Sequence, residues 1–568
     1  MKILARLIPL TFPLLLIANP ADLVLSNGKI VTVDNNFNVA KALAVKDGKI
    51  LAISKDTPQK AWIGKDTQVI DLCGKMVLPG LIDSHVHPTG ASMFEASHEI
   101  PPMEDIPDVL AYIRDRAKVV PEGEWIRLSQ VFITRLKEQR FPTRAELDSA
   151  APKNPVVFRT GPDASVNSLA LAENGIDREF AKEHSAHVIV DEDGEPTGKL
   201  VQSSKVLKYK SNSTRKSLGE AARDKRLIQL FQDYNRSGIT GIIDRNCGTS
   251  ARAQYGRLLD SGKLTIRVRA SRGISPNGDL ATIMKRLDDY AADPYFQKPD
   301  PKFGVLGVKV FQDGGMLTGS AWFQKPWGKS KIYGITDPEY RGMQFIQEQR
   351  MEELVRACVS RGLAFTAHCQ GDAATTTLAR VFAKVDKDIC IAPTRSSITH
   401  SSFMTPEAIK LAAKVGFGID LQPAWLYKDG WTLNKQFGNE RLKYFIPLKS
   451  LFKAGVKAGG GSDHMQKIGP LRSVNPYDPF LGMWITITRT AQWHDAPIRP
   501  EQALNREEMI RYYTINNAWL MGMEDEVGSL EPGKLADFII LDTDLLECSD
   551  DEVRSTKVLS TWMDGKKL

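Results

Sequence analysis

Two kinds of hydrophobic pattern alternate along the middle of the chain. Residues 223–235 and 347–361 carry apolar side chains at three- and four-residue steps, which is the spacing of one face of a helix. Between such segments lie short apolar runs of strand-forming residues. These runs include residues 156–158, 241–244, 307–311 and 364–367. Because alternating strands and helices are typical of a parallel sheet covered by helices, we predict an α/β fold built around a barrel.

Both ends of the chain have the pattern of β-strands. Residues 23–33 and 42–53 are short β-prone runs, each with an Asn-Gly or Asp-Gly pair that favours a hairpin turn. Another β-prone run lies near the C-terminus, in residues 558–563. We therefore predict one β-sandwich domain that combines residues 22–75 with residues 525–568.

The composition is that of an ordinary globular protein. Lys and Arg number 75 and Asp and Glu number 68, so the net charge is +7 over 568 residues, of which 42% are hydrophobic. These values exclude disorder, collagen and coiled coil. No basic block with interleaved aromatic residues is present, so we expect no nucleic-acid partner. Six scattered cysteines without a CxxC pair do not form a disulfide framework.

Residues 1–21 resemble a signal peptide. Lys2 and Arg6 precede an apolar run over residues 7–18, and small or polar residues follow it. The run is too short to span a hydrocarbon core about 30 Å thick, so we expect no stable membrane insertion. The expected location is periplasmic or secreted. If the segment is not a leader, the protein would be cytoplasmic.

The first sign of chemistry is the pair His85 and His87, which follows an apolar run. On a strand, positions i and i+2 point to the same side, so two imidazoles converge on one point. Imidazole pairs of this kind are typical of metal sites, although a single histidine is more often a surface or hydrogen-bonded residue.

Four further candidates lie in or directly after β-prone runs: Lys309, His368, His400 and Asp463. A barrel of about 250 residues with eight strands repeats about every 31 residues. His368 and His400 are 32 residues apart and His400 and Asp463 are 63 apart, which is close to one and two repeats. These side chains are therefore expected at the same end of one barrel.

The interval between His87 and Lys309 is longer than the repeat predicts. It is 222 residues, which exceeds three repeats by roughly 130. We therefore predict a barrel over residues 76–524 with an insertion within about residues 95–225, which could wall a pocket.

Taken together, these residues resemble the metal-dependent amidohydrolase superfamily, and within it the amidohydrolase family 3 or YtcJ-like branch. The resemblance covers nearly the whole chain and implies a distorted (β/α)8 TIM barrel with a composite β-sandwich domain formed by both chain ends. The segments that carry it are residues 79–87 (Pro-Gly-Leu-Ile-Asp-Ser-His-Val-His), 308–314, 367–373, 399–400 and 461–463.

The resemblance also implies a set of metal ligands. His85 and His87 would bind one divalent metal ion, and His368 and His400 a second. Lys309, carboxylated by carbon dioxide, would bridge the two ions. Asp463 would bind metal and serve as general base, with His400 and Lys309 as further members of the catalytic site. A homodimer is common among the proteins that the chain resembles.

The chemistry of these residues agrees with that assignment. Neutral imidazoles and oxygen ligands suit Zn²⁺, which lowers the pKa of a bound water from about 15.7 to near 7. The ammonium of Lys309 would be repelled by metal ions, so carbamate formation or deprotonation must remove its charge. With one or two zinc ions per chain, we expect hydrolysis of a non-peptide C–N bond in an amide, N-substituted formamide, urea, carbamate or cyclic amide.

Four residues are candidates for contact with a small-molecule substrate: Asp163, Trp322, Gln370 and His464. Asp163 stands where the family commonly has a histidine and would select a cationic or hydrogen-bond-donating group, or else form a turn after Pro162. Trp322 would line an apolar cleft or pack in the fold, and Gln370 would orient a neighbouring group. His464 adjoins Asp463.

Two alternatives stay open, because a fold does not determine a substrate. The same metal site could perform deamination or ester hydrolysis, which analysis of the leaving group would separate. The chain could also be a non-catalytic binding or regulatory protein that kept the barrel, and metal analysis would distinguish that case.

Overall fold

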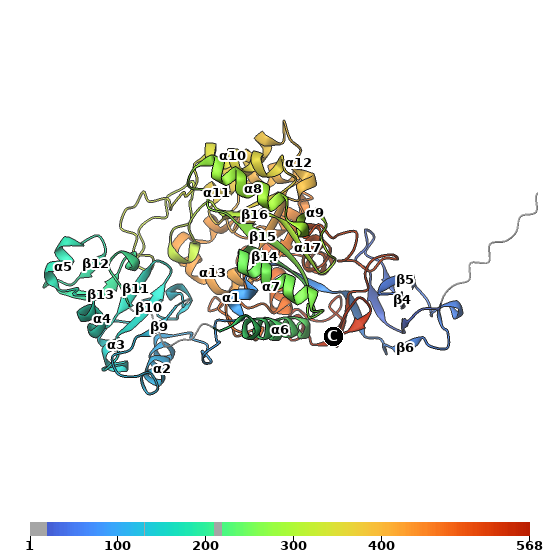
Figure 1. Ribbon diagram of the computed structural model, residues 1–568, viewed down its shortest axis with the longest axis horizontal. Helices are drawn as coiled ribbons and strands as arrows, with labels where there is room; N and C mark the ends of the chain where they lie inside the picture. The colour runs from blue at the N-terminus through green and yellow to red at the C-terminus, as the bar shows by residue number, and fades with distance from the viewer. Residues whose placement is uncertain (1–19, 130, 210–217) are drawn as a thin grey trace, which may run out of the picture.

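The structure, a computed structural model, describes residues 20–129, 131–209 and 218–568. The predicted leader, residues 1–21, lies almost entirely outside the described residues. Figure 1 shows a central barrel with its helices, a β unit at one side that holds both chain ends, and a second β unit at the opposite side. Among the described helices, none has the length and apolar character needed to cross a membrane.

The central barrel is a sheet of eight parallel strands whose spatial order follows the sequence. This arrangement is the one that repeated strand–helix units produce. It confirms the predicted (β/α)8 barrel. The strands are β8 (Leu81–Val86), β14 (Ile239–Cys247), β15 (Arg267–Gly273), β16 (Phe303–Phe311), β17 (Ala364–Cys369), β18 (Ser397–His400), β19 (Gly418–Leu421) and β20 (Ala458–Gly460).

Backbone contacts between the first and last strands complete the ring. The N–H of Asp463 donates to the carbonyl of His85, and the N–H of His87 donates to the carbonyl of His464, both at 2.8 Å. Gly461 makes this closeness possible, because a Cβ there would lie 2.7 Å from the Cβ of His85. Gly461, directly after β20, therefore brings Asp463 against the end of β8.

Helices cover the outside of the barrel (Figure 1). Each presents an apolar face to the strands; in α10, for example, Met351, Leu354, Val355 and Cys358 are buried together. The helices predicted over residues 223–235 and 347–361 are confirmed. The main helices of this layer are α6 (Glu220–Arg236), α7 (Thr249–Asp260), α8 (Leu280–Ala291), α10 (Glu348–Val359), α11 (Asp372–Val385), α12 (Pro406–Val415), α13 (Pro423–Phe437), α15 (Pro479–Thr488), α16 (Arg506–Tyr513) and α17 (Ile515–Leu520).

Strands from both chain ends form two sheets that share one core. The six-stranded sheet combines β2 (Lys29–Val31), β3 (Val39–Ala40) and β7 (Met76–Pro79) with β21 (Phe538–Leu541), β22 (Val558–Met563) and β23 (Lys566–Lys567). The four-stranded sheet contains β1 (Leu23–Ser26), β4 (Ala42–Lys46), β5 (Lys49–Ser54) and β6 (Gln68–Asp71). Leu25 and Leu43 of one sheet belong to the same buried cluster as Val77 and Phe538 of the other. The composite β-sandwich is thus present.

One boundary differs from the sequence prediction. β7, over residues 76–79, was expected in the barrel, but it pairs with β2 and β21 of the six-stranded sheet. A continuous apolar run leads from β7 into β8, and periodicity cannot divide such a run between two sheets.

A separate sheet lies between β8 and β14 in the sequence. Its strands are β9 (Ile126–Leu128), β10 (Val156–Thr160), β11 (Asp163–Val166), β12 (Val188–Val190) and β13 (Pro196–Leu200), and α2 (Ile106–Ala117), α3 (Arg144–Ala150), α4 (Ser168–Glu173) and α5 (Arg178–Glu183) accompany them. The run at residues 156–158, grouped by its pattern with the barrel strands, is therefore a strand of this sheet. Its apolar character comes from a local core that contains Val156 and Phe158.

Candidate metal centre and adjoining cavity

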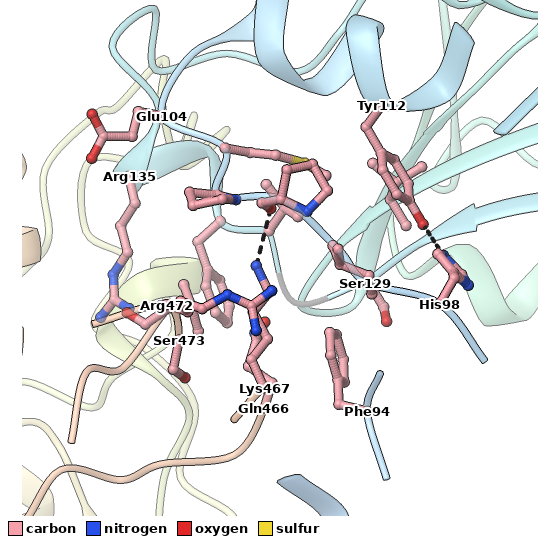
Figure 2. A pocket seen from close by; sticks show the side chains of 18 of the residues that line it. Phe94, His98, Glu104, Tyr112, Ser129, Arg135, Gln466, Lys467, Arg472 and Ser473 are labelled. Carbon is pink, nitrogen blue, oxygen red and sulfur yellow. Dashed lines mark hydrogen bonds between the residues drawn. The ribbon is translucent and has the colours of Figure 1, made fainter. Parts of the chain in front are cut away.

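A cavity of about 320 Å³ adjoins the end of the barrel where the strands finish (Figure 2). Its walls come from residues within 94–104, 127–129, 131–135 and 466–474, together with Tyr112 of α2 and Lys428 of α13. These segments follow β8, β19 and β20 along the chain or belong to the inserted unit. In (β/α)8 barrels the loops that follow the strands form the face where ligands bind.

The six residues predicted to bind metal all lie at this end of the barrel. Because the strands are parallel, their last residues meet on one face. The six are His85 in β8, His87 directly after it, Lys309 in β16, His368 in β17, His400 at the end of β18 and Asp463 after β20.

His85, His87 and Asp463 form the tightest group. The Nε2 atoms of the two histidines are 3.3 Å apart, and Asp463 Oδ1 lies 3.4 Å from His85 Nε2 and 3.2 Å from His87 Nε2. Ligand atoms bound at about 2.1 Å in a tetrahedral site are separated by about 3.4 Å. The three donor atoms therefore have the spacing that a zinc ion requires.

His400 and His368 extend this group on the other side of His85. The ring of His400 stacks on that of His85 at 4.7 Å and meets the ring of His368 edge-on at 4.5 Å. Burial lowers the pKa of His368 to about 3, and burial with the neighbouring His368 lowers the pKa of His400 far below its usual value. Both rings are therefore neutral at pH 7, the state in which a nitrogen lone pair can bind a metal.

Lys309 is buried in the barrel beside these histidines. Its burial lowers the pKa of the amine to about 7, although the carboxylates of Asp420 and Asp463 act in the opposite direction. A substantial fraction of the amine is consequently uncharged near neutral pH. An uncharged amine is the form that reacts as a nucleophile.

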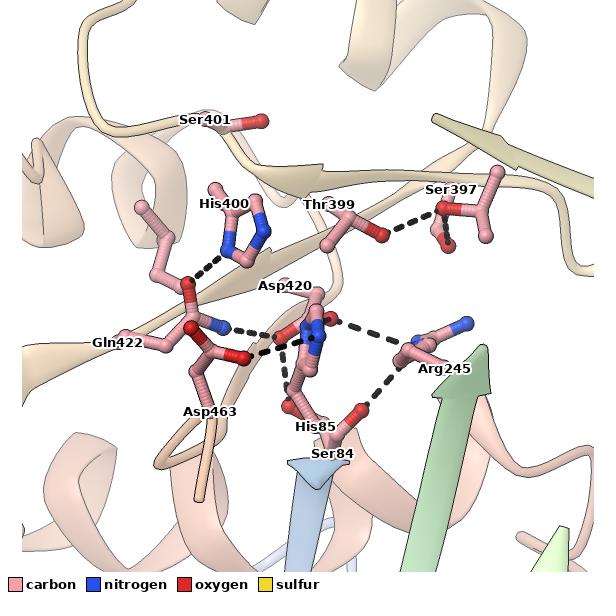
Figure 3. A network of polar contacts seen from close by, with 12 residues as sticks. Ser84, His85, Arg245, Ser397, Thr399, His400, Ser401, Asp420, Gln422 and Asp463 are labelled. Atoms are coloured by element: carbon pink, nitrogen blue, oxygen red, sulfur yellow. Dashed lines mark hydrogen bonds and ion pairs between the residues drawn. The ribbon is translucent and has the colours of Figure 1, made fainter. Parts of the chain in front are cut away.

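Asp420 in β19 holds His85 in position (Figure 3). The sequence patterns did not identify Asp420 as a site residue. Its Oδ2 lies 3.0 Å from His85 Nδ1, while Oδ1 accepts hydrogen bonds from Ser84 Oγ and Gln422 Nε2, both at 2.8 Å. Arg245 Nε is 3.3 Å from the same carboxylate. With its Nδ1–H directed at Asp420, His85 keeps Nε2 free as a ligand atom.

The same network continues to His400. Gln422 Oε1 lies 2.7 Å from His400 Nδ1, so the amide accepts the ring N–H and leaves Nε2 of His400 with a lone pair. Asp420 lies in the short strand Gly-Ile-Asp-Leu, and the only signal of its role in the sequence is a carboxylate between two aliphatic residues. A single acidic residue of that kind is too common to mark a site.

Asp313, directly after the glutamine that follows β16, organises the loops beside His368. Its carboxylate accepts backbone N–H groups of Gln370, Gly371 and Trp322, each at 2.9 Å. Trp322 and Gln370, two of the residues predicted to contact substrate, are thereby fixed near the histidine group. In the described part of the chain, the buried Oε1 of Gln370 has no hydrogen-bond partner, which leaves it available for a ligand.

The other two predicted substrate contacts are placed differently. His464 is buried, with Nδ1 2.6 Å from Tyr234 Oη and Nε2 2.8 Å from the carbonyls of Gln466 and Lys467. Asp163 begins β11 in the inserted sheet, where its Oδ1 accepts the N–H of Gln202 at 2.9 Å. These contacts favour structural roles for both side chains, and their contact with substrate stays a prediction.

Comparisons with known proteins agree with this geometry. Residues 68–568 match the model of a family described as the amidohydrolase family. An N-substituted formamide deformylase of Arthrobacter pascens is 28% identical over 96% of this chain and 97% of its own length. A putative amidohydrolase, YtcJ, of Bacillus subtilis (strain 168) is 23% identical over 95% of this chain and 98% of its own length.

A solved structure resembles the whole fold. An uncharacterized metal-dependent hydrolase from Pyrococcus horikoshii OT3 superposes with a TM-score of 0.65 at 21% identity, covering 93% of this chain and 99% of that chain.

Proposed function

Because the chain belongs to the amidohydrolase family, we propose that it is a metal-dependent hydrolase of a non-peptide C–N bond in a small molecule. The relative named as an N-substituted formamide deformylase, similar along nearly its full length, favours an acylated amine such as an N-substituted formamide. Ureas, carbamates and cyclic amides contain the same kind of bond and are the next candidates.

The observation that carries this proposal is the convergence of His85 Nε2, His87 Nε2 and Asp463 Oδ1 within 3.2–3.4 Å of one another. Two imidazoles and a carboxylate are typical ligands of zinc in hydrolases. Zn²⁺ bound there would polarise a carbonyl group and make water acidic enough to supply hydroxide at pH 7.

Residues of the chain itself would direct the proton transfers. Asp463 Oδ2 is held by Asn475 Nδ2 at 3.3 Å, so the carboxylate is oriented while it accepts a proton from the attacking water. The same carboxyl group would then return that proton to the leaving nitrogen. His400 would orient the carbonyl of the substrate, supported by the Gln422 amide at its other ring nitrogen.

Lys309 would complete a two-ion version of the site. Its buried amine, with a pKa lowered to about 7, is suited to carboxylation by carbon dioxide. The carbamate would remove the positive charge and provide two oxygen ligands between the groups His85–His87 and His368–His400. Gln370 Oε1 and the Trp322 ring would contact the substrate.

A direct test combines metal analysis with a substrate panel. Purified protein should contain one or two zinc ions per chain and hydrolyse at least one member of a panel of N-substituted formamides, other acylated amines, ureas and carbamates. Chelation should abolish turnover and added Zn²⁺ should restore it. Release of ammonia from an amino-substituted ring, or of an alcohol, would instead identify deamination or ester hydrolysis.

The Asp463→Asn variant tests the role of Asp463 as general base. Asparagine removes the carboxylate but keeps a side-chain oxygen that can bind the metal. We expect turnover to fall at least about 100-fold with the metal content retained, because proton transfer by a positioned group contributes that much. Asp115→Asn, at an exposed site on α2, is the control. Unchanged turnover would refute the role of Asp463, and failure to bind any metal after reconstitution would favour a non-catalytic barrel protein.

A further inference from the structure

The cavity beside the histidine group has an unbalanced charge. Among the described residues that line it, five are cationic and one, Glu104, is anionic. The cationic residues are Arg127, Arg135, Lys428, Lys467 and Arg472. A cavity lined mainly by one sign of charge attracts a ligand of the opposite sign.

Two of these cations already have carboxylate partners. Arg135 makes a two-point contact with Asp429, at 2.8 and 2.6 Å. Arg472 makes a two-point contact with Glu95, at 3.0 and 2.9 Å, and a further contact with Glu99. Their charges are largely balanced, so they shape the wall more than they attract an anion.

Lys467 and Lys428 are different. Lys467 Nζ donates to the carbonyl oxygen of Pro101 and Lys428 Nζ to Gln492 Oε1, each at 3.0 Å. Both acceptors are neutral, and an ammonium has three N–H donors. Each lysine therefore retains N–H donors, and no carboxylate of the described residues lies within ion-pair distance of either ammonium, although Glu95 and Glu99 act on Lys467 and Glu104 and Asp429 act on Lys428 from further away.

The burial of Lys467 makes this charge costly. Its exposed fraction is 6%, and loss of hydration lowers the pKa of the amine to about 8, against the attraction of Glu95 and Glu99 and with the repulsion of Arg472. At pH 7 the amine is still mostly protonated. A bound anion would compensate for the hydration that burial removes. Figure 2 shows Lys467 next to Gln466 and Arg472 in the lining of the cavity.

Apolar side chains form another part of the lining. Phe94, Met103, Leu128, Phe132 and Val474 contribute to it. Cavities that bind small organic molecules commonly combine such a lining with a few polar groups, in volumes from about 300 Å³ upward.

Side-chain contacts link the wall of the cavity to the metal centre. Arg135 Nη1 donates to Asn475 Oδ1 at 2.8 Å, and Asn475 Nδ2 donates to the Asp463 carbonyl at 2.7 Å. Trp425 Nε1 lies 3.2 Å from the same Asn475 oxygen, and its ring stacks on His400 at 4.7 Å. The wall of the cavity and the metal centre are therefore joined through the same two side chains, Asn475 and Trp425.

We propose that this cavity binds an amphipathic organic anion, a carboxylate carried on an aromatic or aliphatic body. The ammonium of Lys467 binds the carboxylate, Lys428 adds a second positive charge, and the apolar walls contact the body. Under the proposed function, on which this step rests, the substrate is an acylated amine whose amine portion carries the carboxylate, with its C–N bond at the histidine group.

Binding of two matched probes tests the site without catalysis. Phenylacetate and phenylacetamide have the same shape and differ in charge. On chelator-treated protein, calorimetric titration should show that phenylacetate binds at least about tenfold more tightly than phenylacetamide. Equal affinity for both probes, or no binding of phenylacetate, would overturn the proposal.

The Lys467→Gln variant should lose about tenfold in affinity for phenylacetate and change by less than about twofold for phenylacetamide. Lys467→Arg, which keeps the charge, should restore most of the binding. Lys118→Gln, at an exposed site directly after α2, is the control. If Lys467 serves only to hold Pro101, Lys467→Gln will lower the affinity for both probes by the same factor or change neither affinity. Either result contradicts the proposal. Should that variant not fold, Lys428→Gln decides by the same comparison.

A second pair of compounds separates this proposal from the proposed hydrolase activity. For 4-(formamidomethyl)benzoate against 4-(formamidomethyl)benzamide, we expect kcat/KM to be at least about tenfold higher for the anion. Equal values would overturn the anion site and leave the hydrolase intact. Charge-selective binding of phenylacetate without turnover of any acylated amine would refute the hydrolase and support the anion site.

Discussion

Single residues around the metal centre act mainly by deciding which atom a ligand presents. His85 offers Nε2 to the centre because Asp420 takes its Nδ1–H, and His400 is oriented in the same way by Gln422. Asp420 and Gln422 contact the histidine rings at Nδ1, away from the group of donor atoms formed by His85, His87 and Asp463. Such positioning residues commonly affect metal affinity by about 10- to 100-fold.

Replacement of Asp420 by asparagine tests this role. The amide oxygen would have to accept from His85, and the NH₂ group would then face the donors of Ser84 and Gln422 or the cationic Arg245, which forms an ion pair with the carboxylate. We expect zinc affinity to fall about 10- to 100-fold, measured by competition with a chelator on protein whose circular dichroism is unchanged. Ser84→Ala, which removes one donor and keeps the carboxylate, should have a smaller effect. Equal zinc affinity of wild type and Asp420→Asn would show that the contact does not tune the ligand.

At the scale of elements, the site depends on how closely neighbouring strands approach. Gly307 in β16 lies opposite Ala364 in β17, and a Cβ at position 307 would lie 1.9 Å from the Ala364 carbonyl oxygen. The two strands carry Lys309 and His368 two and four residues further on. Glycine therefore sets the separation of two candidate ligands.

Gly307→Ala should force β16 and β17 apart. We expect a loss of about 2–3 kcal/mol in the free energy of unfolding, the cost of overpacking a buried contact, and a lower metal content. Urea unfolding and metal analysis measure the two effects. Gly248→Ala is a matched control, because a Cβ there meets no atom within 4 Å. If Gly307→Ala were as stable as that control, the strand spacing would not depend on this glycine.

At the scale of the whole molecule, a buried ion pair joins the barrel to the sandwich. Arg267 in β15 contacts both carboxylate oxygens of Asp537, at 2.6 and 2.7 Å, and also Asp564 near the C-terminus. Arg267 and Asp537 are almost completely buried. The C-terminal part of the sandwich is therefore joined to the barrel by charge.

Arg267→Ala should destabilise the protein by about 3–5 kcal/mol, because it leaves a buried carboxylate without its counter-charge. The shift of the urea unfolding midpoint measures this loss. Arg236→Ala removes an exposed arginine paired with Asp233 one helical turn away and should cost less than about 1 kcal/mol. Similar midpoints for the two variants would show that the buried pair is not important for holding the parts together.

Much of the fold followed from local pattern. Apolar periodicity distinguished the helices over residues 223–235 and 347–361, and the repeat of about 31 residues placed His368, His400 and Asp463 at one end of a barrel. The pair His85 and His87 was recognisable because side chains alternate along a strand. Local pattern did not separate β7 from β8 or assign residues 156–158 to their own sheet, since a strand reveals its apolar side and not its partner.

The sequence by itself determined the barrel, the sandwich of both chain ends and the candidate ligands, because these depend on residue type and short-range spacing. Only the tertiary structure decided that Asp420, 335 positions after His85, holds its ring, and that Lys467 and Pro101 meet across a cavity. Contacts between distant segments arise when the sheet closes. The periodicity of the sequence does not predict which side chains come into contact when the sheet closes.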